Sequence, residues 1–172
     1  GDLVITGDDN AELKLKAASS SGNDIIAFLN SSGTTKGNIF YDTDNNFMVF
    51  KTNGTASSNE RLRIASDGKI GINASDPDCM LHVAKASAGT VSADGNAVLA
   101  IENNNHCVFN MMTPTDKSSY IMMGDPDDVS AGQIRYDNNV DRLTIDVNGG
   151  EKVRILPGGE FFVGVQTFYA SQ

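Results

Sequence analysis

The sequence predicts an all-β fold, and three observations carry that prediction. Short stretches such as residues 61–64 and 152–155 alternate apolar and polar side chains with the two-residue period of a strand. Asn-Gly and Asp-Gly pairs, which suit tight hairpin turns, recur between such stretches. No stretch of the sequence keeps the spacing of an amphipathic helix over three turns. Residues 20–30 come nearest, and their Ile-Ile-Ala-Phe run suits a strand equally well.

The expected strands and turns follow one another along the whole chain. The clearest strands are ELKLK, RLRI, KIGI, MLHV, RLTIDV and KVRI, at residues 12–16, 61–64, 69–72, 80–83, 142–147 and 152–155. Each offers one face to a core and the other to water. Type I′ turns, in which both central residues have positive φ, are predicted at Asn53-Gly54, Asp67-Gly68, Asp94-Gly95 and Asn148-Gly149. The sequence thus predicts short antiparallel strands joined by hairpins.

Composition and charge exclude several classes of function. The 22 acidic and 13 basic residues give a formal net charge of −9, and no basic cluster is present for nucleic acid or for an anionic membrane surface. No apolar run reaches the ~20 residues of a membrane span, and the first residues do not resemble a signal peptide. Cys79 and Cys107 lack the spacing of zinc ligands. We expect two free thiols, with a single disulfide as the alternative.

The sequence also repeats itself. With Gly37 placed over Gly132, "GNIFYDTDNNFMVFKTNG" lies over "GQIRYDNNVDRLTIDVNG" at one constant offset. The identities there are Gly37, Ile39, Tyr41, Asp42, Asn53 and Gly54 against Gly132, Ile134, Tyr136, Asp137, Asn148 and Gly149. Beyond the extra segment "TASS" of the first copy, a second offset brings Glu60, Arg63, Ile64 and Gly68 over Glu151, Arg154, Ile155 and Gly159. We therefore predict two tandem copies of one β module, residues 1–96 and 97–172, the second truncated at its C-terminal end.

A four-residue strand in such a module is marginally stable by itself. Burying about two aliphatic side chains contributes roughly 3–6 kcal/mol, whereas ordering four residues costs about 6 kcal/mol. The strand therefore persists only where its apolar face is covered, either inside a sandwich or by identical chains around an axis. The absence of Trp and the many Gly and Ser favour thin layers, and so an intertwined or stacked oligomer.

A longer motif lies at residues 59–87, NERLRIASDGKIGINASDPDCMLHVAKAS. It resembles a repeated element of bacteriophage tail fibres and related virion fibres, whose usual form is E-R-(M/L)-R-I-x-x-x-G-x-(V/I)-G-I-G-T-x-x-P-x-x-x-L-H-V. The matching residues are Glu60, Arg61, Leu62, Arg63, Ile64, Gly68, Ile70, Gly71, Ile72, Pro77, Leu81, His82 and Val83. Residues 73–75 depart from the pattern, which concerns only the local turn. The resemblance covers residues 37–87 well and 132–165 more loosely.

The resemblance implies an elongated, β-rich homotrimer in a virion appendage, made in the host cytoplasm. In that family the element often precedes a C-terminal intramolecular chaperone of the endosialidase type, which we expect to be removed or absent. The implied function is a structural segment of a phage tail fibre or spike involved in host attachment. The implied partners are the chain itself, other virion proteins and a host cell-surface glycan or protein. A head fibre or capsid-decorating protein is the alternative, and a glycan-degrading tailspike domain is a less favoured one.

The sequence predicts no catalytic, cofactor-binding or metal site, and hence no enzyme. Residues 42–47, DTDNNF, open like a calcium loop but lack the Gly and Glu that complete an EF-hand, so a polar hairpin loop is favoured. Residues 124–132 cluster Asp125, Asp127 and Asp128, and a solvated turn is favoured there.

The two histidines are expected to be structural. His82 lies in a predicted strand, and we expect it at a subunit contact or facing solvent. His106 and Cys107 are adjacent, which on a strand directs them to opposite faces and makes a poor catalytic pair.

Two features bear on binding. The pairs Met111-Met112 and Met122-Met123 are expected to fill core space rather than to bind a partner. A host-contact surface is expected in loops without a counterpart in the other copy, at residues 16–36, 84–96 and 110–131, or at Phe168 and Tyr169. Three symmetric copies would convert weak single contacts into durable attachment.

Overall fold

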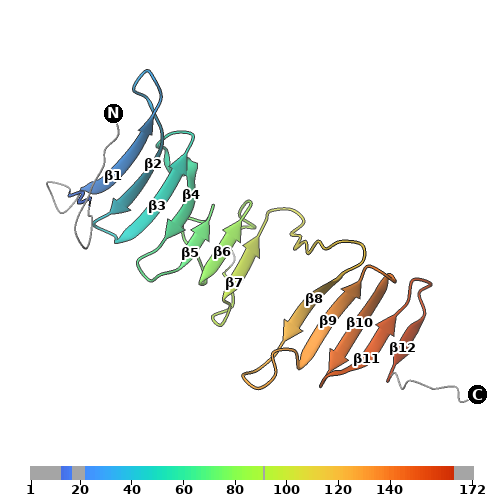
Figure 1. Ribbon diagram of the computed structural model, residues 1–172. Coiled ribbons are helices and arrows are strands. Elements are labelled where there is room, and N and C mark those ends of the chain that lie inside the picture. Colours follow the sequence, from blue (N-terminus) through green and yellow to red (C-terminus); the bar gives the residue numbers. More distant parts are fainter. Residues whose placement is uncertain (1–12, 17–21, 91, 165–172) are drawn as a thin grey trace, which may run out of the picture. The chain divides into compact units, whose positions relative to one another are not determined.

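Figure 1 shows the computed structural model of the chain, which describes residues 13–16, 22–90 and 92–164. The chain forms two compact units, divided between Val108 and Phe109, and each contains one β-sheet. The described residues contain no α-helix and one short 3-10 turn, Ser57–Asn59. The predicted all-β class is confirmed.

The first sheet has seven strands that follow the order of the chain. They are β1 Asn23–Leu29, β2 Thr35–Asp42, β3 Phe47–Thr52, β4 Glu60–Ile64, β5 Ile70–Ile72, β6 Leu81–Ala84 and β7 Leu99–Glu102. Strands β1 to β5 form an antiparallel meander, and β6 and β7 continue the sheet in parallel with β5. Within the range 20–30, the described residues 22–30 thus contribute strand β1 and no helix. Of the strand predicted at 12–16, the described residues 13–16 form no strand.

The parallel end of the first sheet differs from the predicted hairpins. Residues 73–80 and 85–98 each return the chain to the starting side of the sheet, so β6 and β7 run in the direction of β5 (Figure 1). Asp94-Gly95 lies in the second connection, and neither residue has positive φ, so the type I′ turn predicted there is wrong. Alternation along a strand does not reveal whether its partner is parallel or antiparallel.

The second sheet has five strands, and all neighbours are antiparallel. They are β8 Ser118–Met123, β9 Gly132–Asp137, β10 Arg142–Val147, β11 Gly150–Ile155 and β12 Phe161–Val163. Strand β7 falls in the range 97–172 predicted for the second copy, yet it pairs with β6 of the first sheet. The boundary between the copies stays a prediction.

The hairpin turns confirm the predicted chemistry in part. Asn53 and Gly54 have φ values of 67° and 110°, and Asn148-Gly149 likewise has two positive φ values, 52° and 67°. At Asp67-Gly68 only the glycine has a positive φ, 86°, so the type I′ prediction is wrong there. The Asp67 carboxylate instead accepts a hydrogen bond from the Lys69 backbone N–H at 3.2 Å, which stabilises a different tight turn.

The two sheets share one register. Gly37 of β2 faces Thr52 of β3, and Gly132 of β9 faces Val147 of β10. These four residues occupy aligned positions of the two repeated segments, and the pairs that follow them along both hairpins are aligned as well. Strands β2 and β3 therefore pair as β9 and β10 do.

The correspondence extends to both sides of this hairpin. An irregularity interrupts the β3–β4 pairing at Phe50 and the β10–β11 pairing at Ile145, which are aligned positions. On the other side, Ile39 faces Ile26 of β1 as Ile134 faces Ile121 of β8. Strands β1 to β5 thus have the order and the register of β8 to β12.

Neither unit contains a thick core. Among the described residues, the buried apolar side chains are Val49, Ala74, Pro77, Cys79 and Ala84, and the buried polar ones are Asn38, His82 and Thr144. Val49 and Thr144, both 0% exposed, lie at aligned positions in the middle of β3 and β10. Each unit is a single-layered sheet, in agreement with the thin layers expected from composition.

Candidate functional site

One face of the first sheet carries apolar side chains on all seven strands. Cross-strand partners point to the same face and neighbours along a strand to opposite faces, so the register assigns each side chain to a face. Asp24 and Thr52 lie at the margins of this face. We name its apolar set the first apolar face: Ile26, Phe28, Ile39, Tyr41, Met48, Phe50, Leu62, Ile64, Ile70, Ile72, Leu81, Val83, Leu99 and Ile101.

The second sheet has an apolar face built in the same way. Its rows pass through Ile134 and Tyr136 of β9, the residues aligned with Ile39 and Tyr41 of β2. We name its apolar set the second apolar face: Ile121, Met123, Ile134, Tyr136, Leu143, Ile145, Val147, Val153, Ile155, Phe161 and Val163. Ser119 adds a hydroxyl at its edge.

Both apolar faces are open within their own units. Phe28 is 55% exposed and Leu99 is 51% exposed on the first face, and Phe161 is 62% exposed on the second. Ile39 and Ile145, near the middle of each face, are half-buried because neighbouring side chains of the same sheet shield them. A contiguous exposed apolar surface of this kind marks a site of association.

The opposite faces carry charged residues at aligned positions. In the first sheet Arg63 donates to the two carboxylate oxygens of Glu60 at 2.8 and 2.9 Å, and its guanidinium lies 3.9 Å from the centre of the Phe47 ring. In the second sheet Arg154 donates to Glu151 at 2.6 Å. Each sheet therefore has one apolar side and an opposite side on which its charged residues lie among apolar ones; we call the latter the charged side.

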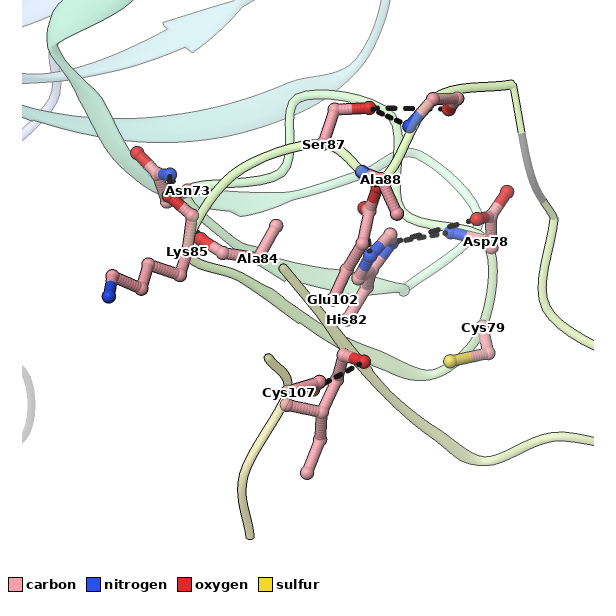
Figure 2. Close-up of polar contacts among 12 residues, drawn as sticks. Asn73, Asp78, Cys79, His82, Ala84, Lys85, Ser87, Ala88, Glu102 and Cys107 are labelled. Atoms are coloured by element: carbon pink, nitrogen blue, oxygen red, sulfur yellow. Dashed lines mark hydrogen bonds and ion pairs between the residues drawn. The ribbon is translucent and has the colours of Figure 1, made fainter. Parts of the chain in front are cut away.

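A buried polar cluster lies on the charged side, at the parallel end of the first sheet (Figure 2). His82 of β6 is 5% exposed, and its Nε2 lies 3.0 Å from Oε2 of Glu102 on β7. Its Nδ1 accepts a hydrogen bond from the Asp78 backbone N–H at 3.4 Å, so Nε2–H is the donor to Glu102. The strand predicted for His82 is confirmed. The prediction that its side chain faces solvent is wrong, because other residues of the first unit bury the side chain.

The carboxylate of Glu102 joins strand β7 to two other parts of the first unit. It accepts hydrogen bonds from the backbone N–H of Ala88 and from the His82 ring. The bond from Ala88, and smaller contributions from Ser87 and His82, lower the pKa of Glu102 below its usual value, although desolvation opposes this. The cluster therefore ties β6 and β7 to the connection between them.

The cysteines do not take part in this cluster. Cys79 is buried and its Sγ donates to the Leu81 carbonyl at 3.3 Å, whereas Cys107 is exposed and its Sγ donates to the Ile101 carbonyl at 3.4 Å. Both are free thiols, as expected. Each thiol is thus directed to a backbone carbonyl and not to the His82 ring.

The two acidic stretches form capped turns. The Asp42 carboxylate accepts hydrogen bonds from the backbone N–H groups of Asp44 and Asn45 at 3.1 and 2.9 Å. The Asp125 carboxylate accepts two similar bonds at 2.9 Å from residues 127 and 128, and these bonds hold its pKa below the usual range. Within the described ranges, no group of three or more His, Cys, Asp or Glu side chains is arranged to hold a metal ion.

The methionine pairs and the predicted contact loops differ from expectation. Met111, Met112, Met122 and Met123 are all exposed, so the prediction that they fill core space is wrong within the single chain. Residues 16–36 and 110–131 were expected to lack counterparts, yet they contain β1 and β8, which occupy aligned positions in the two sheets. Phe168 and Tyr169 lie outside the described residues.

Comparison with known proteins assigns no family to the chain. No family model matches it, and no curated protein matches it. In the part of the chain that the structure describes, no helix is long and apolar enough to cross a membrane. The resemblance to virion fibre repeats stays a prediction.

Sequence reasoning did not identify Glu102 and Asp78 as partners of His82. Strands β6 and β7 both alternate, but only their parallel register places His82 beside Ala100 and Glu102 within reach of the ring. The LHV motif and the glutamate on the next apolar stretch were the available signals. They were insufficient because the direction of β7 depends on the connection that precedes it.

Proposed function

We propose that this chain is a structural virion protein, a segment of a homotrimeric phage tail fibre or spike involved in host attachment. The observation that carries the proposal is the pair of single-layered sheets, each with an apolar face left open by its own unit. The motif at residues 59–87 supplies the connection to virion fibres. No catalytic role is part of the proposal.

The open faces support association with further copies of the chain. Fully burying one large aliphatic or aromatic side chain contributes about 1.5–3 kcal/mol. Phe28, Leu99 and Phe161 each keep half or more of their surface in water, so most of that contribution is still available to a partner. A second copy presents the same faces, and around an axis such faces cover one another.

Three copies are preferred to two because of the resemblance to trimeric virion fibres. Two copies stacked face to face as a sandwich would also cover the apolar faces. The test must therefore distinguish a trimer from such a dimer. The proposed appendage places the charged faces outward, where other virion proteins and the host surface can reach them.

The proposal includes two tandem copies of one module. The shared register of β1 to β5 and β8 to β12 supports it, as do details inside the turns. Tyr41 Oη donates to Asn46 Oδ1 at 3.1 Å, and Tyr136 Oη donates to Asp141 Oδ1 at 3.2 Å. Asn46 and Asp141 also share a positive φ, 54° and 48°. Repetition lets both units associate through the same kind of interface.

The test is the oligomeric state of the 18.3 kDa chain, measured by sedimentation velocity and native mass spectrometry. We expect a species of three chains at micromolar concentration. A folded monomer would overturn the proposal, and a stable dimer would replace the trimer by a sandwich.

Adjacent residues of β8 provide a matched pair of variants. Met123 lies on the second apolar face and is 51% exposed, whereas Met122 lies on the opposite face and is 54% exposed. We expect Met123→Asp to raise the dissociation constant of the oligomer at least tenfold, because it places a charge in the interface. Met122→Asp should leave it within about twofold. Equal effects of the two substitutions would show that the apolar face is not the interface.

A further inference from the structure

The charged side of the second sheet carries a row of side chains that crosses all five strands. We name it the arginine row: Tyr120, Arg135, Thr144, Arg154 and Phe162. Each residue is the direct cross-strand partner of the next, so the five share one face. With strands about 4.8 Å apart, the row extends over ~19 Å.

The centre of the row contains buried polar atoms without partners. Thr144 is 0% exposed, and its Oγ1 has no hydrogen-bond partner among the described residues. The same is true of Nε of Arg135, a half-buried residue that makes no ion pair within the described ranges. Leaving a buried donor or acceptor unpaired costs free energy. A sheet that keeps such groups together is suited to a ligand that satisfies them.

The other charges of this face are engaged within the sheet. Arg154 donates to Glu151 at 2.6 Å. The Arg142 guanidinium lies 3.5 Å from the Asp137 carboxylate, although its Nε, like that of Arg135, is buried without a described partner. The third carboxylate, that of Asp146, accepts a hydrogen bond from the Gln133 amide through Oδ2, while its Oδ1 is buried without a described partner. The three arginines and three carboxylates balance in sum. Arg135 is the arginine that has no carboxylate of its own.

The aligned row of the first sheet has an apolar centre and a paired arginine. Its members are Ile25, Phe40, Val49, Arg63 and Gly71. Val49 is also 0% exposed, but it is apolar and leaves no polar atom unsatisfied. The arginine of that row is stacked on an aromatic ring and paired with a carboxylate. The first sheet therefore serves as an internal control that lacks the site.

We propose that the arginine row binds an acidic saccharide through its carboxylate. The planar guanidinium of Arg135 matches a carboxylate in bidentate geometry. When it turns toward the ligand, it uncovers Thr144, whose hydroxyl then gains a hydrogen-bond partner. The rings of Tyr120 and Phe162, 38% and 45% exposed, flank the site and offer apolar surfaces to sugar rings.

The anion-binding geometry rests on the second sheet alone. The choice of a saccharide among anions rests on the proposed function in attachment and on the two flanking rings.

The experiment is a calorimetric titration of the full chain with an oligosaccharide of alternating glucuronate and N-acetylglucosamine. The same oligosaccharide with its carboxylates reduced to alcohols is the control ligand. We expect the acidic form to bind and Arg135→Ala to weaken binding by roughly tenfold or more, as for loss of a charged hydrogen bond. Arg135→Lys should recover part of the affinity because it keeps the charge without the planar fork.

Arg61→Ala is the matched control variant. Arg61 is an exposed arginine of the first sheet that donates to Thr52 Oγ1 at 3.1 Å, so its removal changes the net charge equally. We expect a change of less than about twofold, because Arg61 is not a member of the arginine row and an exposed surface charge contributes little. An equal loss in Arg61→Ala and Arg135→Ala would reduce the effect to net charge and overturn the site.

A double variant keeps the test independent of misfolding. Arg135→Phe with Thr144→Val gives the second sheet the residues that Phe40 and Val49 provide in the first. We expect it to fold and to lose at least tenfold in affinity. Unchanged binding by this variant, no binding by the unaltered chain, or equal binding of the reduced oligosaccharide would each overturn the proposal.

Two further measurements separate the sources of a positive signal. Competition by inorganic sulfate at the same concentration as the oligosaccharide would show an adventitious ion only and overturn the saccharide. Sedimentation of the same samples distinguishes this inference from the proposed function. A trimer that does not bind the oligosaccharide overturns the arginine row alone, whereas a monomer that binds it overturns the trimer alone.

Discussion

The first and second sheets have the same register but fill the middle of their charged sides differently. Val49 and Thr144 occupy aligned positions and are both fully buried, yet one is an apolar side chain under Phe40 and Arg63 and the other a hydroxyl between two arginines. The apolar faces, in contrast, differ mainly in which large apolar residue is present, and their polar residues are confined to the margins, at Asp24 and Thr52 in the first sheet and at Ser119 in the second. One side of the repeated sheet therefore keeps an apolar centre, while the centre of the other side changes chemistry.

The largest effect on stability is expected at one end of the cross-strand row that contains Val49 in the first sheet and Thr144 in the second. At this end the first sheet has Gly71 on β5 and the second has Phe162 on β12. A Cβ on Gly71 would lie 2.0 Å from the backbone carbonyl oxygen of Ala74, in the connection that leads to β6. Gly71→Ala should therefore reduce the free energy of unfolding of the first unit by about 3 kcal/mol, since backbone atoms have to move. Hydrogen exchange of β5 and β6 amides measures this.

The control for that substitution is a strand glycine of the second sheet. A Cβ on Gly132 would meet nothing closer than 3.7 Å, so Gly132→Ala should change stability by less than about 1 kcal/mol. Similar losses in the two variants would mean that the covering connection adapts, and that the glycine does not distinguish the sheets.

The next effect concerns the buried pair itself. Val49→Ala removes two methyl groups from a fully buried site and should cost about 2 kcal/mol, measured by hydrogen exchange in β3. Thr144→Val replaces a buried hydroxyl that lacks a described partner and should be neutral or stabilising in β10. A loss in Thr144→Val comparable to that in Val49→Ala would show that the hydroxyl is satisfied in solution, and would remove the main contrast between the sheets.

The smallest effect is a pH dependence of the connection between β6 and β7 in the first unit. The folded-state pKa of Glu102 is lowered from 4.5, chiefly by the Ala88 backbone N–H, so its stabilising contribution is complete above pH 4.5. That contribution is lost as the pH falls through the folded-state pKa. Protection of the Ala88 amide should therefore decrease in acid before that of β11 amides does. In Glu102→Gln this difference in pH dependence should disappear, and its persistence would assign it to another group.

Much of the fold was predictable because it depends on local chemistry. Alternation predicted the strands at 61–64 and 142–147, and the Asn-Gly pairs predicted two hairpin turns with positive φ. The correspondence of β1 and β8 was not predictable from the sequence. Only one aligned pair, Ile26 and Ile121, is identical, and the other aligned residues have different side chains although they occupy the same register positions. Backbone pairing tolerates many sequences on an edge strand.

The sites were less predictable because they depend on rows across strands. The members of the arginine row come from different strands. Arg135, Thr144 and Arg154 are not close to one another in the sequence, and only the pairing of their strands makes them neighbours. His82 and Glu102 come together through a parallel connection that alternation does not reveal. In a β-protein, a site of this kind becomes visible once the register is known.

The open apolar faces also affect a newly synthesised chain before it associates with other copies. Such faces adhere to other apolar surfaces on contact. The outer strands β1, β7, β8 and β12 each have a neighbouring strand on only one side within the described ranges, so their other side is a place where a foreign strand can pair. The net charge of −9 repels similar chains, but at physiological salt the repulsion acts only within about 8 Å. The negative charge of the chain thus opposes aggregation of unassembled chains. Because concentrated salt screens this charge, we expect added salt to increase the turbidity of a solution of unassembled chains.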